Sequence, residues 1–535
     1  MNLIQWLFFI LIAQIIHGLC TWNLYLKADR KPIESFIPIY NLVVLMKIIK
    51  RPRWWVFLLF IPIINLLIIP VVWIEVIRSF GKNTTKDTII VLLTLGFYIA
   101  YLNYTSKNCV YIENRDLKPK SKTEDTIGSL LFAVIVATLV HTYVIQPFTI
   151  PSSSLEKTLY TGDFLFVSKL NFGARTPITT IAVPMVHDSI PLSGLKSYVF
   201  NDDFSKKETS FLNKFQLPYF RLPAIENIKR NDIVVFNQPA DTLSNMDDFH
   251  PDRNYYKPID KKTNLVKRCV GIPGDSLEIR EGYIYINGKI SQLPKSAKAQ
   301  YNFLIDTKGQ AISQDDLVSK YGARDGLKYQ NGYFAITNTG EYFLTLTDDE
   351  AKLIAKNPIV KGVKKYLTPK GEDGGVFPHI TSLGWNVDNF GPIYIPKKGK
   401  TVKLTIETLP FYKRIIEEYE HNTLKVQGKK IIINRKFANS YTFKQDYYWM
   451  MGDNRQNSLD ARFWGFVPFD HVIGKPVFIW FSWDKNGKGI NKVRWNRVFS
   501  FVNGNGEPKS YLIHFLGLIL IGMMINKVIK NRKKV

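Results

Sequence analysis

Apolar residues gather at the two ends of the chain, whereas the long middle region is polar and carries only short apolar runs. A helix needs about 20 mostly apolar residues to cross a bilayer. Five segments approach this length, and we expect each to be a membrane helix: residues 3–19, 54–77, 88–104, 126–145 and 511–525. The first has no basic start and no small-residue cleavage motif, which predicts a retained helix rather than a cleaved leader.

Prolines and length modify this pattern at two places. Pro62 and Pro70 lie inside the segment 54–77 and are expected to kink it. The segment 36–49 is apolar but short, and it contains Pro38 and Lys47. We expect it to be an interfacial or re-entrant piece rather than a span.

Basic residues indicate which side of the membrane each loop occupies, because short loops rich in Lys and Arg stay in the cytoplasm. The stretch 107–122 and the tail 527–535 are both basic, so both are expected inside. The region 146–510 is then outside, and counting back through the helices puts the N-terminus outside as well. One loop disagrees, because residues 78–86 and their basic side chains fall on the outer side in this count.

The middle region has the pattern of a β protein. Short runs of β-branched and aromatic residues, several of them alternating with polar ones, predict strands at 232–236, 276–280, 283–286, 401–406 and 430–434. Glu281-Gly282 and Asn287-Gly288 are tight-turn signals between them. Residues 371–375 and 392–399 are expected to be loops. The predicted fold class is therefore a mainly antiparallel β domain with a second β-rich lobe, plus transmembrane α-helices.

Charge and cysteine content narrow the choice of partners. The 71 Lys and Arg residues exceed the 45 Asp and Glu residues, which gives a formal net charge of +26. Such a balance favours nucleic acid or anionic lipid, and the apolar segments together with the absence of an RNP-like or zinc-finger pattern favour lipid. Three cysteines are too few for a disulfide framework, and Cys269, alone in the outer region, is expected to be a free thiol.

Four segments are dense in chemically useful residues. They read IPSSSLEKTL at 150–159, KRNDIVVF at 229–236, KRCVGIPGD at 267–275 and GDNRQNSLDARFWGFVP at 452–468. Taken alone, the serine cluster is typical of a helix-exit loop, and a single lysine is typical of a solvated surface. The four together, in this order after a membrane helix, change that interpretation.

In this arrangement the chain closely resembles the bacterial type I signal peptidases, or leader peptidases, which are membrane-anchored Ser/Lys proteases. The resemblance implies that Ser154 is the nucleophile and Lys267 the general base. Ser152, with the backbone N–H of Ser154, would then stabilise the oxyanion. The other implied roles are orientation of the lysine by Ser458, an ion pair of Asp460 with Arg462, and substrate pockets lined by Phe148, Ile150 and Val266.

The chemistry explains why a lysine is suitable only in a particular setting. A serine hydroxyl is a poor nucleophile without a base, and an ordinary lysine, with a pKa of about 10.4, is charged at neutral pH. A useful base needs a pKa nearer to ~7–8, and burial among apolar side chains lowers the pKa of a lysine. Leu265, Val266, Val270 and Ile272 supply such neighbours, while Arg268 would point to the opposite face of the strand.

The chain departs from the family pattern at four positions. Leu155 stands in place of the usual Met, Lys157 in place of Pro, Ala461 in place of Ser and Asn231 in place of Gly. Lys157 is expected to loosen the loop and to add charge near the bilayer, and Ala461 excludes a catalytic hydroxyl at that position. None of the four removes the dyad.

The apolar and basic segments, together with the resemblance, predict a division of the chain into eight parts, although the N-terminal helices exceed the one or two anchors usual in the family. These are an N-terminal membrane module (1–104), a basic cytoplasmic linker (105–125), a transmembrane helix (126–147), the first part of the catalytic domain (148–275), an inserted β-rich lobe (276–445), the last part of the catalytic domain (446–509), a C-terminal transmembrane helix (510–526) and a basic cytoplasmic tail (527–535).

Function and location follow as expectations. We expect a plasma-membrane, multi-pass serine endopeptidase with its catalytic domain on the extracytoplasmic side and its C-terminus in the cytoplasm. It would cleave signal peptides from exported preproteins, after small residues such as Ala, through an acyl-enzyme. No cofactor, metal or nucleic acid is expected.

Three alternatives remain open from the sequence. A Ser-His-Asp hydrolase would need a Gly-x-Ser-x-Gly elbow, which is absent, and His471 would be its only plausible base. A non-enzymatic scaffold or transporter would use intramembrane ionisable groups, and only Glu75, His17 and His141 qualify. A catalytically inactive homologue is disfavoured because Ser154 and Lys267 are both present.

Overall fold

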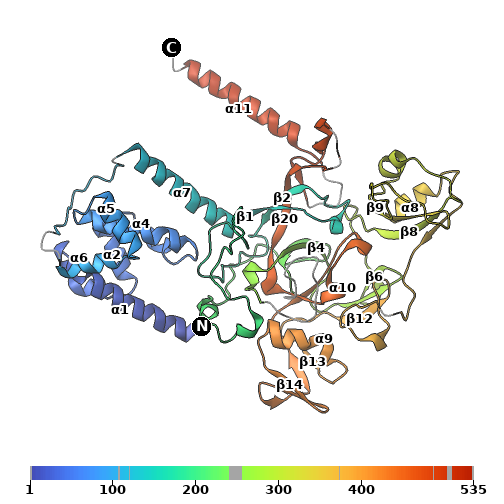
Figure 1. Ribbon diagram of the computed structural model, residues 1–535, viewed down its shortest axis with the longest axis horizontal. Coiled ribbons are helices and arrows are strands. Elements are labelled where there is room, and N and C mark those ends of the chain that lie inside the picture. Colours follow the sequence, from blue (N-terminus) through green and yellow to red (C-terminus); the bar gives the residue numbers. More distant parts are fainter. Residues whose placement is uncertain are drawn as a thin grey trace. The chain divides into compact units, whose positions relative to one another are not determined.

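The chain divides into two compact units, which are described separately (Figure 1). The computed structural model describes residues 3–105, 109–119, 121–239, 256–372, 374–485, 487, 489–502 and 509–532. The first unit combines residues 1–144 with the segments 174–222 and 241–262. The second unit consists of residues 145–173, 223–240 and 263–535.

Helices dominate the first unit. They are α1 (Leu3–Lys27), α2 (Tyr40–Ile48), α3 (Trp55–Leu58), α4 (Ile64–Ser79), α5 (Thr85–Leu93), α6 (Phe97–Thr105) and α7 (Lys122–Tyr143). Val44, Met46 and Ile77 are fully buried in their common apolar cluster. A buried ionic contact joins Glu75 of α4 to Arg51 and Arg115, so polar as well as apolar contacts hold this unit together.

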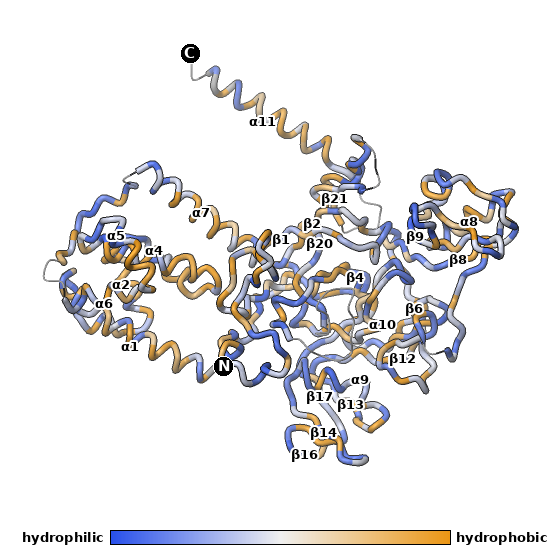
Figure 2. The backbone as a smooth tube through the Cα atoms, in the orientation of Figure 1, coloured by the Kyte–Doolittle hydropathy of each residue, from blue (hydrophilic) through white to orange (hydrophobic). Residues whose placement is uncertain are grey.

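Two helices of the described chain are long and apolar enough to cross a membrane, α1 from Ile4 and α7, and both are coloured as hydrophobic over most of their length in Figure 2. α5 and α6 qualify only as a pair, and they are bent by 115°. The bend lies at Leu95 and Gly96, which both have positive φ. Three of the five expected spans thus have a helical counterpart of sufficient length, one of them only if a bent pair counts as one span.

The prediction of one helix over residues 54–77 is wrong. The structure interrupts it between α3 and α4, and α4 alone has 16 residues. Pro62 has no N–H to donate and disfavours helical geometry at the preceding residue, while Ile63 has a φ of +69°. Pro70, by contrast, is accommodated inside α4.

Other boundaries also differ from expectation. The residues predicted as interfacial, 36–49, form the short helix α2 in the core of the first unit. The helix expected at 126–147 ends at Tyr143, and a strand follows in which Pro147 takes a position that needs no ladder donor. The C-terminal helix α11 (Leu512–Arg532) has an apolar part of only 16 residues, Leu512–Lys527. Residues 107, 108, 120 and 533–535 of the predicted basic regions lie outside the described residues.

The rest of the first unit is mostly irregular. Residues 174–222 are joined by isolated β-bridges such as Thr179 with Gln216. This segment also contacts the N-terminal end of α1, because Trp6 Nε1 donates a hydrogen bond of 3.1 Å to Gln216 O. The rings of Phe9 and Phe215 meet edge to face beside it.

A curled antiparallel sheet is the centre of the second unit. Its strands follow the order β1 (Ile145–Thr149), β2 (Asp163–Ser168), β20 (Val472–Ser482), β3 (Ile233–Asn237), β4 (Asn264–Gly271), β18 (Tyr447–Met451) and β19 (Val467–Pro468), with β21 (Ser500–Phe501) added against β20. β2 and β20 are thus neighbours in the sheet although they are far apart in the chain. Their register runs from Asp163 opposite Ser482 to Ser168 opposite Lys475. The mainly β fold predicted from the sequence is confirmed.

Smaller sheets make up the region between β4 and β18. They are β12 (Phe390–Tyr394) with β5 (Ser276–Arg280), β6 (Tyr283–Ile286) and β7 (Lys289–Ile290); β11 (Gly362–Lys365) with β8 (Tyr301–Asp306), β10 (Glu341–Leu346) and β9 (Asp325–Gly326); β13 (Thr401–Lys403) with β17 (Ser440–Thr442); and β14 (Leu424–Gln427) with β15 (Lys430–Ile433) and β16 (Lys436–Phe437). Short helices α8 (Asp348–Ile354) and α9 (Leu409–Arg414) accompany them, and α10 (Ala461–Trp464) follows β18. Each expected strand has a counterpart, although β13 covers only 401–403 of the predicted 401–406 and the loop predicted at 392–399 begins inside β12.

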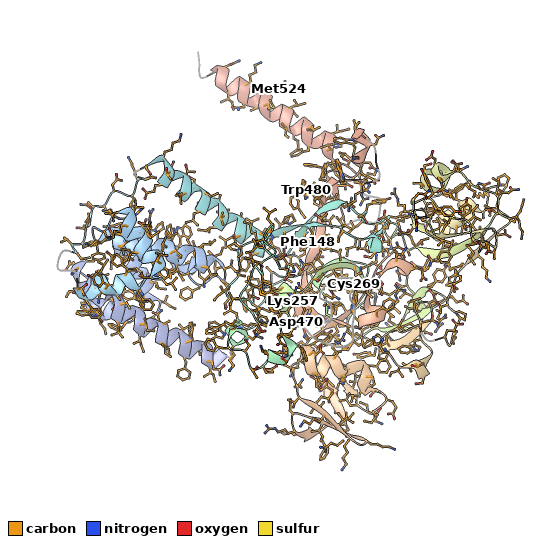
Figure 3. All side chains as sticks on the ribbon, viewed as in Figure 1. Phe148, Lys257, Cys269, Asp470, Trp480 and Met524 are labelled. Carbon is orange, nitrogen blue, oxygen red and sulfur yellow. The ribbon has the colours of Figure 1, made fainter. Side chains whose placement is uncertain are left out.

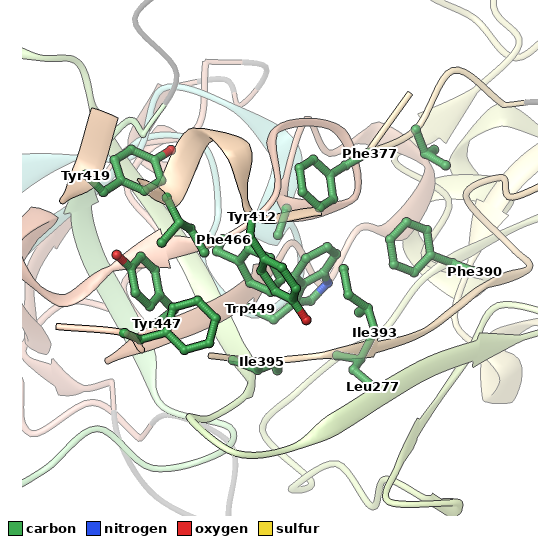
Figure 4. Packing of buried hydrophobic residues seen from close by; sticks show 14 of the residues in the cluster. Leu277, Phe377, Phe390, Ile393, Ile395, Tyr412, Tyr419, Tyr447, Trp449 and Phe466 are labelled. Atoms are coloured by element: carbon green, nitrogen blue, oxygen red, sulfur yellow. The ribbon is translucent and has the colours of Figure 1, made fainter. Parts of the chain in front are cut away.

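Two apolar cores stabilise this region. Trp449 is fully buried and lies among the rings of Phe377, Phe390 and Phe466 (Figure 4). A second cluster, around Leu317 and Ile354, belongs to the sheet of β8 and β10 with α8. Burial of a large aromatic side chain contributes on the order of 2–3 kcal/mol, so the first core fixes β18 firmly beside β4.

Candidate active site

The serine cluster lies in a short turn that follows strand β1. The N–H of Ile150 donates to Asp163 O at 2.9 Å, and its carbonyl accepts from Gly162 N at 2.9 Å. Residues Ser153–Leu155 then form one turn of 3₁₀-helix. Leu155 is buried beneath it, and Ser154 is only 7% exposed. The backbone therefore holds the Ser154 hydroxyl in a fixed and nearly dry position.

Lys267 lies within β4, between the neighbouring strands β3 and β18. It is opposite Val234 in the register with β3, and its side chain is 4% exposed. Its Nζ lies 2.6 Å from Ser154 Oγ, although the two residues are 113 positions apart in the chain. The fold thus brings the two residues of the predicted dyad into hydrogen-bond contact.

The protonation of Lys267 is changed by this setting. Burial lowers the pKa of Lys267 to about 8, because the charged ammonium loses its hydration. Asp460 and Asp453 act in the opposite direction, and Arg462 adds to the lowering. An amine with this pKa is neutral in a useful fraction of molecules near neutral pH.

Asp460 and Arg462 form a buried ion pair behind the lysine. Arg462 donates to the Asp460 carboxylate from Nε and from Nη2, each at 2.9 Å, and both side chains are almost completely buried. The second Asp460 oxygen also accepts from the N–H of Gly452 at 3.0 Å. Burial disfavours the charge of Asp460, but Arg462 holds the pKa of the carboxyl below its usual value. The pair therefore keeps its charge and braces the 452–462 segment.

A second buried ion pair was not predicted from the sequence. Arg268 points to the face of β4 opposite Lys267, as strand geometry requires, and donates to Asp453 from Nε (2.7 Å) and Nη2 (2.6 Å). Thr158, close to the serine turn, donates to the same carboxylate at 2.7 Å. Arg268 in the 267–275 motif and Asp453 in the 452–468 motif could both be seen in the sequence, but only the fold shows that they pair.

Asn454 holds the serine turn from the other side. Its N–H donates to the carbonyl of Ser154 at 3.1 Å, and its side-chain amide donates to the carbonyl of Ser153 at 3.1 Å. Gly452 permits this approach, because a Cβ there would lie 2.5 Å from Ser154 O. The sequence analysis assigned no role to Asn454, which lies within the same motif.

The two accessory serines are placed differently from each other. Ser152 is exposed and precedes the 3₁₀ turn in an extended conformation, with no capping bond from its hydroxyl. Ser458 is 6% exposed, and its Oγ has no hydrogen-bond partner in this structure. Ser458 Oγ therefore makes no hydrogen bond with Lys267 in this structure, and its implied role in orienting the lysine stays a prediction.

The residues expected to line the substrate pockets gather in one apolar cluster. Ile150 is buried, and Phe148, labelled in Figure 3, and Val266 are half-buried and packed against it. Leu155 belongs to the same cluster. The predicted pocket residues thus share one apolar cluster with Leu155, the residue that follows Ser154.

The alternative base lies in a different environment. His471 is 2% exposed, its Nδ1 lies 2.6 Å from Asp470, and its ring packs against Tyr419. Across the part of the chain that the structure describes, no three His, Cys, Asp or Glu side chains gather as a metal site would require. The dyad contact therefore favours serine chemistry with a lysine base.

The comparison with protein families agrees with this geometry. The model of the family described as "Signal peptidase, peptidase S26" matches residues 123–348 and 397–483, more than half of the chain. The chain belongs to the signal peptidase family S26. A second model, of a family of unknown function (DUF5684), matches residues 33–114, within the helical first unit.

Proteins named signal peptidase I are similar to this chain over about 70% of its length. A signal peptidase I of Buchnera aphidicola subsp. Baizongia pistaciae is 24% identical over 70% of this chain and 82% of its own length. The values are 23%, 71% and 95% for signal peptidase I of Rickettsia massiliae, and 24%, 70% and 92% for that of Helicobacter pylori strain 26695. The chain is accordingly a serine-type peptidase of the signal peptidase I class.

The departures from the S26 pattern have structural explanations. Lys157 has a φ of +69°, which proline, fixed near −65°, cannot adopt. Its ammonium group is paired with Glu350 at 2.5 Å and its side chain is 7% exposed, so the expected free charge at this position is absent. Asn231 has a φ of +73°, a conformation that Gly and Asn both tolerate. Ala461 is fully buried at the start of α10.

Proposed function

We propose that this protein is a membrane-bound signal peptidase that cleaves signal peptides from exported preproteins with Ser154 as nucleophile and Lys267 as general base. The observation that carries the proposal is the 2.6 Å separation of Ser154 Oγ and Lys267 Nζ in a buried setting. The lowered pKa of Lys267 supports the role of base, since only the neutral amine can accept the serine proton.

The acylation step follows from this contact. Neutral Lys267 takes the proton of Ser154 as Oγ attacks the scissile carbonyl carbon, and a tetrahedral oxyanion forms. The backbone N–H of Ser154 and the hydroxyl of Ser152 donate hydrogen bonds to that oxyanion. The Lys267 ammonium then gives its proton to the departing amine, the C–N bond breaks, and the signal peptide remains as an ester on Ser154.

Deacylation reverses the proton transfers. Lys267, neutral again, takes a proton from a water molecule that attacks the ester carbonyl. The second tetrahedral intermediate collapses when Ser154 Oγ leaves and recovers its proton from the ammonium. The buried Asp460–Arg462 and Arg268–Asp453 pairs hold β4 and the 452–462 segment still during both steps.

Preproteins are the proposed substrates because of the family and because of the position of the serine in the chain. Ser154 follows the end of α7 at Tyr143 closely, so the intervening residues span at most about 40 Å. A site so close to a membrane helix meets substrates whose own apolar segment is still in the bilayer. Pockets lined by Phe148, Ile150 and Val266 suit small apolar side chains before the cut.

The structure also supports a simpler topology. We propose two crossings before the catalytic domain, with α1 entering the cytoplasm at Lys27 and α7 leaving it. The contact of Trp6 with Gln216 favours an external N-terminal end of α1, because residues 174–222 follow α7 in the chain. If α4 and the bent α5–α6 pair do not cross, the basic residues at 78–86 are cytoplasmic, which satisfies the positive-inside rule.

The proposed activity is tested with the full-length protein in lipid vesicles and a model preprotein with an Ala-x-Ala site. We expect cleavage by the wild type directly after that site, mapped by mass spectrometry, and none by Ser154→Ala at equal folded protein. Cleavage by Ser154→Ala at more than a small fraction of the wild-type rate would refute the assignment of the nucleophile.

A further inference from the structure

The inserted lobe contacts the serine turn through polar side chains at three points. Lys157 Nζ lies 2.5 Å from Glu350 Oε2 of α8. Asp325 of β9 accepts a hydrogen bond of 2.7 Å from the same Asn454 amide that holds Ser153. Arg324 Nε is 3.8 Å from Glu156 Oε1. Two of these contacts fall on the residues that directly follow Ser154 and Leu155.

The first contact is the one that the serine turn depends on most. A residue other than glycine at a φ of +69°, as at Lys157, lies in a region that costs roughly 1 kcal/mol. A buried ammonium group also needs a partner, because its hydration is lost. Burial lowers the pKa of Lys157, and Glu350 opposes that lowering. Glu350 thus offsets both unfavourable features of Lys157, its left-handed backbone and its buried charge, three positions after Ser154.

Glu350 is itself held in place. Its carboxylate accepts from Thr347 N at 2.8 Å, and its own N–H donates to Thr347 Oγ1 at 3.3 Å, which completes a capping box at the start of α8. The next residue, Ala351, and Ile354 are buried in the core of the lobe. Gly322, with a φ of +67°, leaves room for the carboxylate, since a Cβ there would collide with Glu350 Oε1. The carboxylate is therefore a fixed anchor rather than a mobile surface group.

Polar links matter here because apolar packing does not fill the space between the lobe and the turn. Lys157, Tyr160, Arg324 and Glu350 all line a cavity of about 950 Å³. Where a cavity separates the lobe from the turn, the lobe can hold the turn in place only through the groups that bridge the cavity. The Lys157–Glu350 pair is such a bridge.

We propose that Lys157 and Glu350 are positioning residues through which the inserted lobe holds Ser154 against Lys267. This inference rests on the proposed function, in which Ser154 is the nucleophile. Without the ion pair the turn relaxes from its left-handed conformation at Lys157, and the Ser154 hydroxyl moves away from the base. A displacement of this kind lowers kcat and leaves KM nearly unchanged, because the pocket residues Phe148 and Val266 belong to β1 and β4 rather than to the serine turn.

The test compares five variants of the full-length protein in vesicles with the same model preprotein; the fifth, Lys157→Arg, retains the charge at position 157. Glu350→Gln keeps the capping box, which accepts Gln as well as Glu, but removes the charge that faces Lys157. Lys157→Met removes the other partner, and the double variant completes the cycle. Asp349→Asn is the matched control, since Asp349 lies on the same helix with 95% of its side chain exposed.

We expect kcat to fall about tenfold in Glu350→Gln, Lys157→Met and the double variant alike, a modest share of the loss that a 1 Å misplacement can cause. KM is expected to stay within about twofold, Asp349→Asn to behave as wild type, and Lys157→Arg, which retains the charge, to recover most of the activity. The thermal unfolding midpoint of each variant is measured in parallel, and cleavage rates are taken well below that midpoint. A loss of kcat then reflects positioning rather than loss of folded protein.

An unchanged kcat in Glu350→Gln overturns the inference, and so does a loss that tracks the unfolded fraction. Ser154→Ala in the same assay keeps the two proposals apart. Turnover that persists in Ser154→Ala overturns the proposed function. Turnover absent there, together with normal kcat in Glu350→Gln, overturns only the role of the lobe.

Discussion

The strongest prediction concerns the pH dependence of the reaction, because it depends on a single buried amine. An ordinary lysine has a pKa of 10.5, and burial lowers the pKa of Lys267 to about 8. This difference corresponds to about 3 kcal/mol of destabilised charge. At pH 7 about one molecule in ten then carries the neutral base, compared with fewer than about one in a thousand for an ordinary lysine. We expect kcat/KM to rise about tenfold per pH unit below 8 and to level off above it.

The same difference in pKa affects stability, with a definite sign. The unfolded chain keeps the lysine proton up to pH 10.5, whereas the folded chain releases it near pH 8. Between these values the unfolded state binds more protons, so the stability contribution of Lys267 rises with pH across that window and is lowest below it. Lys267→Met is therefore expected to be inactive and yet more stable at pH 7 by up to about 3 kcal/mol.

The assay is the initial rate of preprotein cleavage between pH 6 and 10, with each sample returned to pH 8 to confirm that activity loss is reversible. Lys267→Arg is the control for charge, because guanidinium keeps the cation but cannot give up its proton. It should be inactive at every pH. A flat profile, or a midpoint close to that of an ordinary lysine, would refute the argument from burial.

Three further predictions follow from the packing around the dyad. Gly452→Ala should reduce turnover by at least about tenfold, because the added Cβ would lie 2.5 Å from Ser154 O; normal cleavage kinetics would show that the turn tolerates the shift. Arg462→Met should lower the free energy of unfolding by about 3–5 kcal/mol, because it leaves the Asp460 carboxylate buried without its partner, and urea denaturation measures this; a change below about 1 kcal/mol would argue against a braced segment. Cys269, a buried free thiol whose pKa is raised by burial, should resist alkylation at pH 8 until the protein unfolds, as followed by mass spectrometry of its peptide; labelling at the same rate in the native protein would contradict its burial.

Much of the site could be predicted from local patterns. The four motifs identified Ser154 and Lys267, and apolar neighbours in the chain indicated the environment of the lysine. The pairing of Arg268 with Asp453 could not be predicted, because the partners are 185 positions apart and each is a plausible surface charge in its own segment. The pairing of Lys157 with Glu350, 193 positions apart, could not be predicted either. The motif indicated only that Lys157 replaces the usual proline.

The fold was predictable to a similar degree. The five strands expected from short apolar or alternating runs correspond to β3, β5, β6, β13 and β15, since the period of two is a local property. No residue range was predicted for the other strands of the sheets. The break at Pro62 was underestimated as a kink, because hydropathy alone does not distinguish a continuous span from two short helices packed in a helical core. The association of residues 174–222 with the N-terminal helices left no local signal at all, since it depends on contacts such as that of Trp6 with Gln216.

The pairing of β2 with β20 has a consequence for the order of events during synthesis. Asp163 lies opposite Ser482, and the amide that holds Ser153 belongs to Asn454, 301 positions later. Contacts so distant in the chain close slowly, because a long loop must be ordered first. A ribosome that has produced the serine, the lysine and most of the lobe still carries a chain without Asn454 and β20. The two dyad residues are therefore made long before the segments that hold them, and we expect a chain that stops before Asn454 to lack peptidase activity.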